Sequence, residues 1–475
     1  MRDFIVLTIN KQRHEIRGSE AFMMLADYLR IKAGLCGTKI VCAEGDCGAC
    51  TVLCSRPELG PLKEFKPINA CIILVAQLDC AHILTVEGLK EKNKLSPVQE
   101  ALAYAHASQC GFCTPGFVMA LTALNLKTNK KLTTQNIKNS LTGNLCRCTG
   151  YEAIIKAAQE IKIDSSQAFE KFLVTETNNL GSVQINNKNS QVFFAPSDLQ
   201  EASLWLKNNP GAQILGSSTD IGVGVNKNKI NLAYTLSLHR IRELYSIEKQ
   251  GQSIKVGARV LLSDLRDFCL NLVPEFARFL NIFASPQIKN MATLIGNVAN
   301  ASPIADTPPF LMVSQATLSV LSHAGSRVIP MGELYVGYKR LSLAPDELIT
   351  HISFELPAQN NFLRLYKISQ RRDLDIATVN AAFCCELDTS DKIPLIKNAR
   401  FALGGVAPCV IRVTKTEELL LGQKLDQKLI EEALEQIQLE IMPLDDLRGS
   451  ASFRRVLIDG LLRRYFQEIM DDYHA

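Results

Sequence analysis

The sequence lacks the features that mark membrane, secreted and nucleic-acid-binding proteins. Apolar runs such as residues 72–76 fall far short of the roughly 20 residues that cross a bilayer. The early acid Asp3 is followed directly by strand-like alternation, which does not resemble a signal peptide. Basic and acidic residues number 52 and 48, and no basic stripe concentrates the formal charge of +4. We expect a cytoplasmic protein that binds neither a membrane nor nucleic acid.

A Rossmann nucleotide-binding fingerprint is also missing. Gly222 and Gly224 begin such a pattern, but Lys227 stands where the third glycine belongs. Any dinucleotide cofactor is therefore expected to be bound by a different fold.

Cysteine, in contrast, is abundant and unevenly placed. Of the 15 cysteines, eleven lie between Cys36 and Cys148, and the rest of the chain holds four. An odd number of cysteines in a long chain without a secretory leader points to metal or redox chemistry rather than to disulfides. The chain has 475 residues, 47% of them hydrophobic, which is enough for roughly three domains with real cores.

Hydrophobic periodicity divides the chain further. The first segment is rich in strand patterns and has one helical pattern at residues 21–33, and the second is helical, with Ser96 as a cap before Pro97. A segment rich in Ser, Asn and Lys follows and is typical of a linker, and two segments of mixed strands and helices complete the chain. The predicted boundaries are 1–88, 89–162, 163–191 for the linker, 192–358 and 359–475.

The first group of cysteines has the spacing C-x4-C-x2-C with a distant fourth member, which is the spacing of a plant-type [2Fe–2S] ferredoxin. Its members are Cys42, Cys47, Cys50 and Cys71. Gly45 and Gly48 let the backbone pass close to inorganic sulfide and offer it N–H groups. A zinc site is the alternative, but this spacing is uncommon in zinc modules.

The second group is a C-x2-C pair followed at a distance by a C-x-C pair: Cys110, Cys113, Cys146 and Cys148. Two pairs at helix ends could hold another four-thiolate cluster, because helix N–H dipoles stabilise thiolates. On spacing alone zinc remains an alternative. A thioredoxin-like redox pair is disfavoured, because the sequence context is not βαβ.

A strand followed by a loop of small residues, 215–222, has a shape suited to backbone contact with pyrophosphate. Taken alone, an ordinary β-turn is an equally good interpretation.

Several of these stretches together resemble the molybdenum hydroxylase family, which includes xanthine dehydrogenases. Residues 35–52 are similar to its first iron–sulfur signature, and residues 109–116 with 143–151 are similar to its second. Residues 216–222 and 292–306 resemble its two flavin loops.

The resemblance implies an α+β multidomain fold. Residues 1–88 would form a plant-type β-grasp ferredoxin domain, and residues 89–162 a four-helix [2Fe–2S] domain. Residues 192–358 would form an FAD-binding domain of the PCMH type, and residues 359–475 a C-terminal α+β flavoprotein domain.

The resemblance also implies the cofactor contacts. All eight cysteines of the two groups would be cluster ligands, and a further set of residues would bind FAD. That set is Gln213, Ile214, Leu215, Gly216, Ser217, Ser218, Thr219, Asp220, Phe283, Thr293, Leu294, Ile295, Gly296, Asn297, Asp306, Leu341 and Lys367. Phe283 would lie against the isoalloxazine, although a core position is its alternative interpretation.

By the same resemblance the chain would be an electron-transfer subunit. Hypoxanthine or xanthine would be hydroxylated at a molybdopterin cofactor on a partner subunit, with no catalytic residue for hydroxylation on this chain. Electrons would pass through two [2Fe–2S] clusters to FAD and then to NAD, in an (αβ)2 heterotetramer. Leu374 stands where many relatives carry an acidic residue, which leaves NAD against oxygen as acceptor open.

Three other interpretations remain at this point. The partner could act on an aldehyde, nicotinate or another N-heterocycle. A non-catalytic assembly protein is disfavoured, because a scaffold has no need of eight thiolates. A zinc-stabilised binding module is the last alternative.

Overall fold

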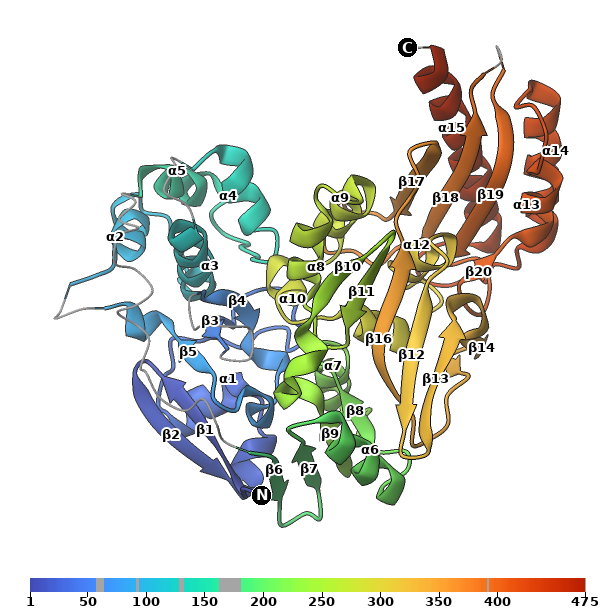
Figure 1. The fold of residues 1–475 in the computed structure, drawn as a ribbon. Coiled ribbons are helices and arrows are strands. Elements are labelled where there is room, and N and C mark those ends of the chain that lie inside the picture. The colour runs from blue at the N-terminus through green and yellow to red at the C-terminus, as the bar shows by residue number, and fades with distance from the viewer. Residues whose placement is uncertain (57–63, 91–93, 128–131, 162–180, 391–392, 475) are drawn as a thin grey trace. The chain divides into compact units, whose positions relative to one another are not determined.

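The computed structural model describes residues 1–56, 64–90, 94–127, 132–161, 181–390 and 393–474. These residues form two compact units. Figure 1 draws their helices and strands as a ribbon. Unit 1 contains Met1–Tyr245 and Ala284–Ala292, and unit 2 contains Ser246–Phe283 and Thr293–Ala475. The predicted α+β multidomain fold is confirmed.

Unit 1 begins with a five-stranded sheet in the order β2-β1-β5-β3-β4. Its strands are β1 (Phe4–Ile9), β2 (Gln12–Arg17), β3 (Thr51–Ser55), β4 (Lys66–Asn69) and β5 (His82–Leu84). Asn10 and Lys11 join β1 to β2 with φ of 48° and 72°, the left-handed conformation that a tight two-residue hairpin requires. β1 pairs in parallel with β5, which gives the mixed sheet of a β-grasp domain.

The single helix expected over residues 21–33 is not continuous. The segment contains the 3-10 turn η1 (Gly18–Phe22), the short helix α1 (Leu25–Asp27) and the π turn η2 (Tyr28–Lys32). Between the first two, Met24 is extended and bridges Leu74, and the next amide donates to the carbonyl of Ile73 at 2.9 Å. A contact with a distant strand-like segment therefore interrupts the helix.

The described part of the second segment contains the helices α2 (Pro97–Tyr104), α3 (Thr114–Lys127), α4 (Thr134–Ser140) and α5 (Glu152–Glu160). Ser96 caps α2 in a capping box with Gln99, so the predicted start of that helix is confirmed, and Thr133 caps α4. Leu53 and Leu84 of the sheet share one buried core with Phe117 and Leu121 of α3. The two predicted cluster domains are therefore packed together.

The last part of unit 1 is a four-stranded sheet in the order β6-β7-β9-β8. It comprises β6 (Val183–Asn186), β7 (Val192–Ala195), β8 (Gln213–Leu215) and β9 (Tyr234–Ser237), with helices α6 (Leu199–Asn208) and α7 (Ile221–Asn226). β6 lies inside the segment predicted as a linker. It forms a strand there because it pairs antiparallel with β7. Residues 162–180 of that segment lie outside the described residues.

Unit 2 contains a five-stranded sheet and a four-stranded sheet. The first has the order β10 (Ile247–Gln250), β11 (Ser253–Gly257), β16 (Leu348–Glu355), β12 (Thr317–Ser322) and β13 (Gly325–Pro330). Its helices are α8 (Leu262–Cys269), α9 (Pro274–Ile282), α11 (Leu294–Ala299) and α12 (Pro308–Val313), and β14 (Tyr335–Gly337) pairs with β15 (Arg340–Leu341).

The four-stranded sheet contains β17 (Asn361–Ile368), β18 (Val379–Asp388), β19 (Leu395–Gly404) and β20 (Ile411–Arg412). It is followed by helices α13 (Thr414–Leu420), α14 (Gln427–Glu440) and α15 (Ala451–His474). An aromatic core joins α15 to this sheet, and the buried hydroxyl of Tyr465 donates to the carbonyl of Phe362 at 2.7 Å.

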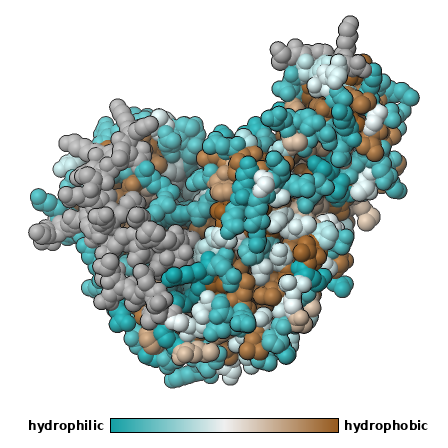
Figure 2. Space-filling view, viewed as in Figure 1, coloured by the Kyte–Doolittle hydropathy of each residue, from teal (hydrophilic) through white to brown (hydrophobic). Residues whose placement is uncertain are grey.

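Apolar side chains are interspersed with polar ones on the face of the molecule drawn in Figure 2. Among the described residues, no helix combines the length and the hydropathy needed to span a membrane.

Candidate metal centres and flavin site

The structure brings together the four cysteines of the first predicted ligand set. The thiols of Cys47 and Cys71 hydrogen-bond to Cys42, which holds the pKa of Cys42 well below its usual range. Cys71 also hydrogen-bonds to Cys50, and sharing its proton with both sulfurs raises the pKa of Cys71. The four sulfurs therefore form one connected group, in which Cys42 contacts Cys47 and Cys71, and Cys71 also contacts Cys50.

The backbone of this loop is shaped around sulfur. The amides of Glu44 and Cys47 point at Cys42 Sγ from 3.4 and 3.5 Å. Gly45 and Gly48 have φ of 81° and 67°, which side chains rarely tolerate. Donors aimed at thiolate sulfur are the feature that stabilises a negatively charged cluster.

The second predicted set is also brought together. Cys148 Sγ lies 3.7 Å from Cys110 Sγ, and Cys113 hydrogen-bonds to Cys146. Burial opposes ionisation of Cys146, but hydrogen bonds from the hydroxyl and amide of Thr149 lower its pKa to about 7. Burial raises the pKa of Cys113 to about 12.

Each set of four thiols supplies the ligands that a two-iron cluster needs. A [2Fe–2S] cluster uses four thiolates, two for each iron, whereas structural zinc needs four ligands around one point. The donor chemistry of both sets and the pairing of the second set thus fit two [2Fe–2S] clusters.

The two ligand loops touch each other directly. The amide of Leu145 donates to the carbonyl of Cys47 at 2.9 Å, and Leu145 is adjacent to Cys146. Asn144 Nδ2 donates to the carbonyl of Gly48 at 3.1 Å. The first of these hydrogen bonds therefore joins the backbone of Cys47, a predicted ligand of one cluster, to the residue next to Cys146, a predicted ligand of the other.

The first predicted flavin loop lies in unit 1, between β8 and α7. Its serines are almost completely buried, and Ser218 Oγ lies 2.6 Å from Gln77 Oε1 and 3.1 Å from the carbonyl of Ile72. Asn226, at the end of α7, donates to the carbonyl of Cys71 at 2.7 Å. The loop is thus fixed against the segment that carries the fourth ligand of the first set.

The second predicted flavin segment lies in unit 2. Thr293 caps α11 by accepting from the amide of Gly296 at 3.0 Å. Asn297 Oδ1 accepts from the amide and the hydroxyl of Thr307, at 3.2 and 2.6 Å. These bonds hold the start of α11 beside the segment that carries Asp306.

Asp306 has partners that the sequence did not reveal. Lys367 Nζ lies 2.7 Å from Asp306 Oδ2, and the two side chains are 2% and 10% exposed. Asn380 Nδ2 donates to Asp306 Oδ1 at 3.2 Å, while Asn380 Oδ1 is buried without a hydrogen-bond partner. Lys367 and Asp306, expected to be separate flavin contacts, thus form one buried ion pair.

Two further predicted contacts are placed at half-buried positions of unit 2. Phe283 ends α9. Leu341 is opposite Tyr335 in the β14–β15 hairpin, and the Tyr335 hydroxyl donates to the carbonyl of Val298 in α11 at 3.0 Å.

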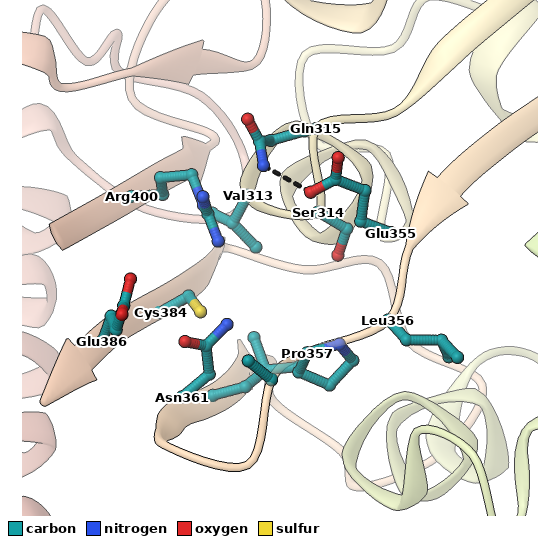
Figure 3. Close-up of a pocket in the computed structure, with 12 residues that line it drawn as sticks. Val313, Ser314, Gln315, Glu355, Leu356, Pro357, Asn361, Cys384, Glu386 and Arg400 are labelled. Carbon is teal, nitrogen blue, oxygen red and sulfur yellow. Dashed lines mark hydrogen bonds between the residues drawn. The ribbon is translucent and has the colours of Figure 1, made fainter. Parts of the chain in front are cut away.

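The pocket drawn in Figure 3 is distinct from all these residues. It is lined by Arg400, Cys384 and Glu386 among others and has a volume of about 240 Å³. That volume is below the range typical of ligand pockets, about 300–1,000 Å³, so it is too small for a dinucleotide.

Four family models match the chain. They are the 2Fe-2S iron–sulfur cluster binding domain over residues 7–76, the [2Fe-2S] binding domain over 85–159, the FAD binding domain in molybdopterin dehydrogenase over 184–358 and the CO dehydrogenase flavoprotein C-terminal domain over 364–469.

Curated relatives match nearly the whole chain. Xanthine dehydrogenase 1 of Arabidopsis thaliana is 28% identical, over 97% of this chain and 39% of the relative. Xanthine dehydrogenase of Drosophila subobscura is 30% identical, over 98% of this chain and 39% of the relative. The chain spans about two fifths of the length of these relatives.

Solved structures share the fold of part of the chain. Quinoline 2-oxidoreductase from Pseudomonas putida 86 matches with a TM-score of 0.54 and 23% identity, over 59% of this chain and 97% of its own. A Cu,Mo-CO dehydrogenase matches with a TM-score of 0.53 and 25% identity, over 57% of this chain and 94% of its own.

The fold, the paired thiols and the flavin-domain matches define an iron–sulfur flavoprotein. More specifically, the chain belongs to the molybdenum hydroxylase family of oxidoreductases and contains the iron–sulfur and FAD-binding domains of that family.

Proposed function

We propose that this chain is the electron-transfer subunit of a xanthine dehydrogenase. Hypoxanthine or xanthine is hydroxylated at a molybdopterin cofactor on a partner subunit, and the electrons pass through this chain to NAD. Thiolate-bound clusters carry single electrons, and flavin exchanges one or two, so the cofactors connect two-electron chemistry at both ends.

The observation that best supports this proposal is the order of the hydrogen bonds that connect the two cluster loops and the first predicted flavin loop within unit 1. The amide of Leu145 meets the carbonyl of Cys47, which joins the two cluster loops. Ser218 of the first predicted flavin loop and Asn226 at the end of α7 contact the carbonyls of Ile72 and Cys71, respectively. This order supports a route from the helical cluster to the plant-type cluster and then to FAD.

In this proposal the eight paired cysteines hold the two [2Fe–2S] clusters. FAD is contacted by residues 213–220, by Thr293 to Asn297 and by Phe283 and Leu341. The ion pair of Lys367 with Asp306 supplies a buried charge pair that hydrogen-bonds flavin hydroxyls or the ring.

Support for xanthine as the substrate comes from the curated relatives, which bear the name xanthine dehydrogenase and align over nearly all of this chain. In this proposal the chain pairs with a molybdenum-cofactor-binding large subunit in an (αβ)2 assembly.

The test is to purify the chain with whatever co-purifies and to assay the complex with hypoxanthine and NAD. Visible absorption of clusters and flavin together with NADH formation is the expected result. A colourless preparation without iron and flavin would refute the electron-transfer role.

A second candidate keeps the same cofactors but pairs the chain with a different molybdenum hydroxylase. It is favoured by the structural matches to quinoline 2-oxidoreductase and Cu,Mo-CO dehydrogenase. An aldehyde, nicotinate or another N-heterocycle would then be the substrate, and the same complex assayed on those compounds distinguishes the two.

A further inference from the structure

A short segment of the chain is part of unit 1, the unit that contains both cysteine sets, although the residues before and after it along the chain belong to unit 2. Ala284–Ala292 belongs to unit 1, whereas Phe283 and Thr293 belong to unit 2. We call this segment the clip. It contains the helical turn α10 (Pro286–Lys289), which Ser285 caps by accepting from the amide of Ile288 at 3.1 Å.

The clip reaches both cluster loops through one side chain. Gln287 is completely buried, and its Nε2 donates to Asn144 Oδ1 at 2.8 Å. The same Nε2 lies 3.3 Å from the hydroxyl of Thr51. Asn144 precedes Cys146 by two positions, and Thr51 directly follows Cys50. We propose that Gln287 is a positioning residue that fixes the loop of Cys47 and Cys50 against the loop of Cys146 and so sets the geometry between the two clusters.

Close packing leaves little freedom at this junction. A Cβ on Gly143 would lie 2.0 Å from Gln287 Oε1, and a Cβ on Gly48 would lie 2.1 Å from the carbonyl of Gly143. On the opposite side, a Cβ on Gly116 would lie 2.2 Å from the carbonyl of Gly48. Since three glycines admit the backbone this closely, the spacing of the loops depends on the groups that join them.

The hydrogen bonds at this junction also hold the side-chain amide of Asn144 in one orientation. Asn144 accepts from Gln287 and donates to the carbonyl of Gly48 at 3.1 Å, so its amide orientation is fixed at both ends. A buried amide without partners destabilises the folded state, whereas a paired one specifies a single arrangement. An apolar side chain of equal volume would fill the space of Gln287 and leave Asn144 Oδ1 unpaired.

This inference rests on the proposed electron-transfer function, because it assumes that both clusters are bound. The test is electron paramagnetic resonance of the dithionite-reduced, purified chain or its native complex. Gln287→Met retains volume but no donor. It should keep iron and FAD content and both cluster signals, but change the magnetic splitting between the clusters and shift the g values of the plant-type signal.

Gln99→Met is the matched control. Gln99 is another glutamine of unit 1. Its side chain accepts from the amide of Ser96, at the start of α2, and donates to the carbonyl of Val86, so it does not contact a cluster loop. Its spectrum should be that of the wild type. Asn144→Asp keeps the acceptor for Gln287 but removes the donor to Gly48, so it should reproduce the altered splitting without any change in volume.

The outcomes separate the two hypotheses. Unchanged splitting and g values in both Gln287→Met and Asn144→Asp would overturn the positioning role while leaving the electron-transfer function intact. Absence of both cluster signals from the wild type would instead refute the electron-transfer function itself.

Discussion

The contact between the flavin loop and the first cluster segment makes a quantitative prediction for Gly222→Ala. Gly222 lies in α7, and a Cβ there would stand 2.1 Å from the carbonyl oxygen of Ile72. The carbonyl of Ile72 belongs to the backbone and cannot turn away as a flexible side chain could. Relief of the overlap therefore requires α7 to shift as a whole. That shift would break the bonds of Asn226 Nδ2 to the carbonyls of Ala43 and Cys71, at 2.8 and 2.7 Å.

The magnitude follows from three contributions. Overpacking destabilises by about 1–3 kcal/mol, and loss of both Asn226 hydrogen bonds adds about 1 kcal/mol each. Helix propensity favours alanine over glycine by about 1 kcal/mol. We therefore expect a net loss of about 2–4 kcal/mol, with faster release of FAD, because the loop ending at Asp220 leads directly into α7.

Gly224→Ala is the control in the same helix. Its Cβ would lie 2.5 and 2.8 Å from Cδ1 and Cγ1 of Ile230, which are atoms of a half-buried side chain rather than of the backbone. Rotation of that side chain relieves the overlap, so the change in unfolding free energy should stay within about 1 kcal/mol. Urea unfolding followed by circular dichroism, with flavin and iron content measured on the same samples, compares the variants. The reasoning is refuted if Gly222→Ala is as stable as Gly224→Ala.

Three further changes test individual parts of the site. Cys113→Ser should remove one of two reduced-cluster resonance signals and leave FAD content near normal; loss of both signals would show that the shared core makes the clusters interdependent. Phe283→Ala should weaken FAD retention without changing iron content, and normal flavin binding would assign Phe283 to the core. Burial lowers the pKa of His82, so its stabilising contribution is present above the unfolded pKa of about 6.5 and is lost as the pH falls. His82→Gln should therefore reduce the acid-side decline in unfolding free energy measured in urea between about pH 7 and 5; an unchanged decline would contradict this.

Local spacing carried most of what the sequence predicted about the clusters. Cys42, Cys47 and Cys50 occupy one loop, and their distance along the chain already restricts which sulfurs can meet. The capping residue Ser96 likewise acts within a few positions, and the helix that it predicts is present.

Features that depend on distant partners escaped the sequence. The helix expected over residues 21–33 is interrupted because Met24 bridges Leu74. β6 was hidden in a polar stretch because its stability comes from pairing with β7. Gln287 has no motif that distinguishes it from an exposed glutamine, and its role becomes visible only where Asn144 meets it.

The division into units also changes how the flavin segments are understood. A continuous FAD-binding segment was predicted over residues 192–358, yet its first loop packs with the cluster loops in unit 1. The contacts that fix that loop run from Ser218 and Asn226 to backbone carbonyls beside Cys71. Contacts of amides and hydroxyls with backbone depend on the path of the chain rather than on the identity of a substrate. The contacts between the segment of Cys71 and the first predicted flavin loop therefore lie inside unit 1, whereas the other predicted flavin contacts belong to unit 2.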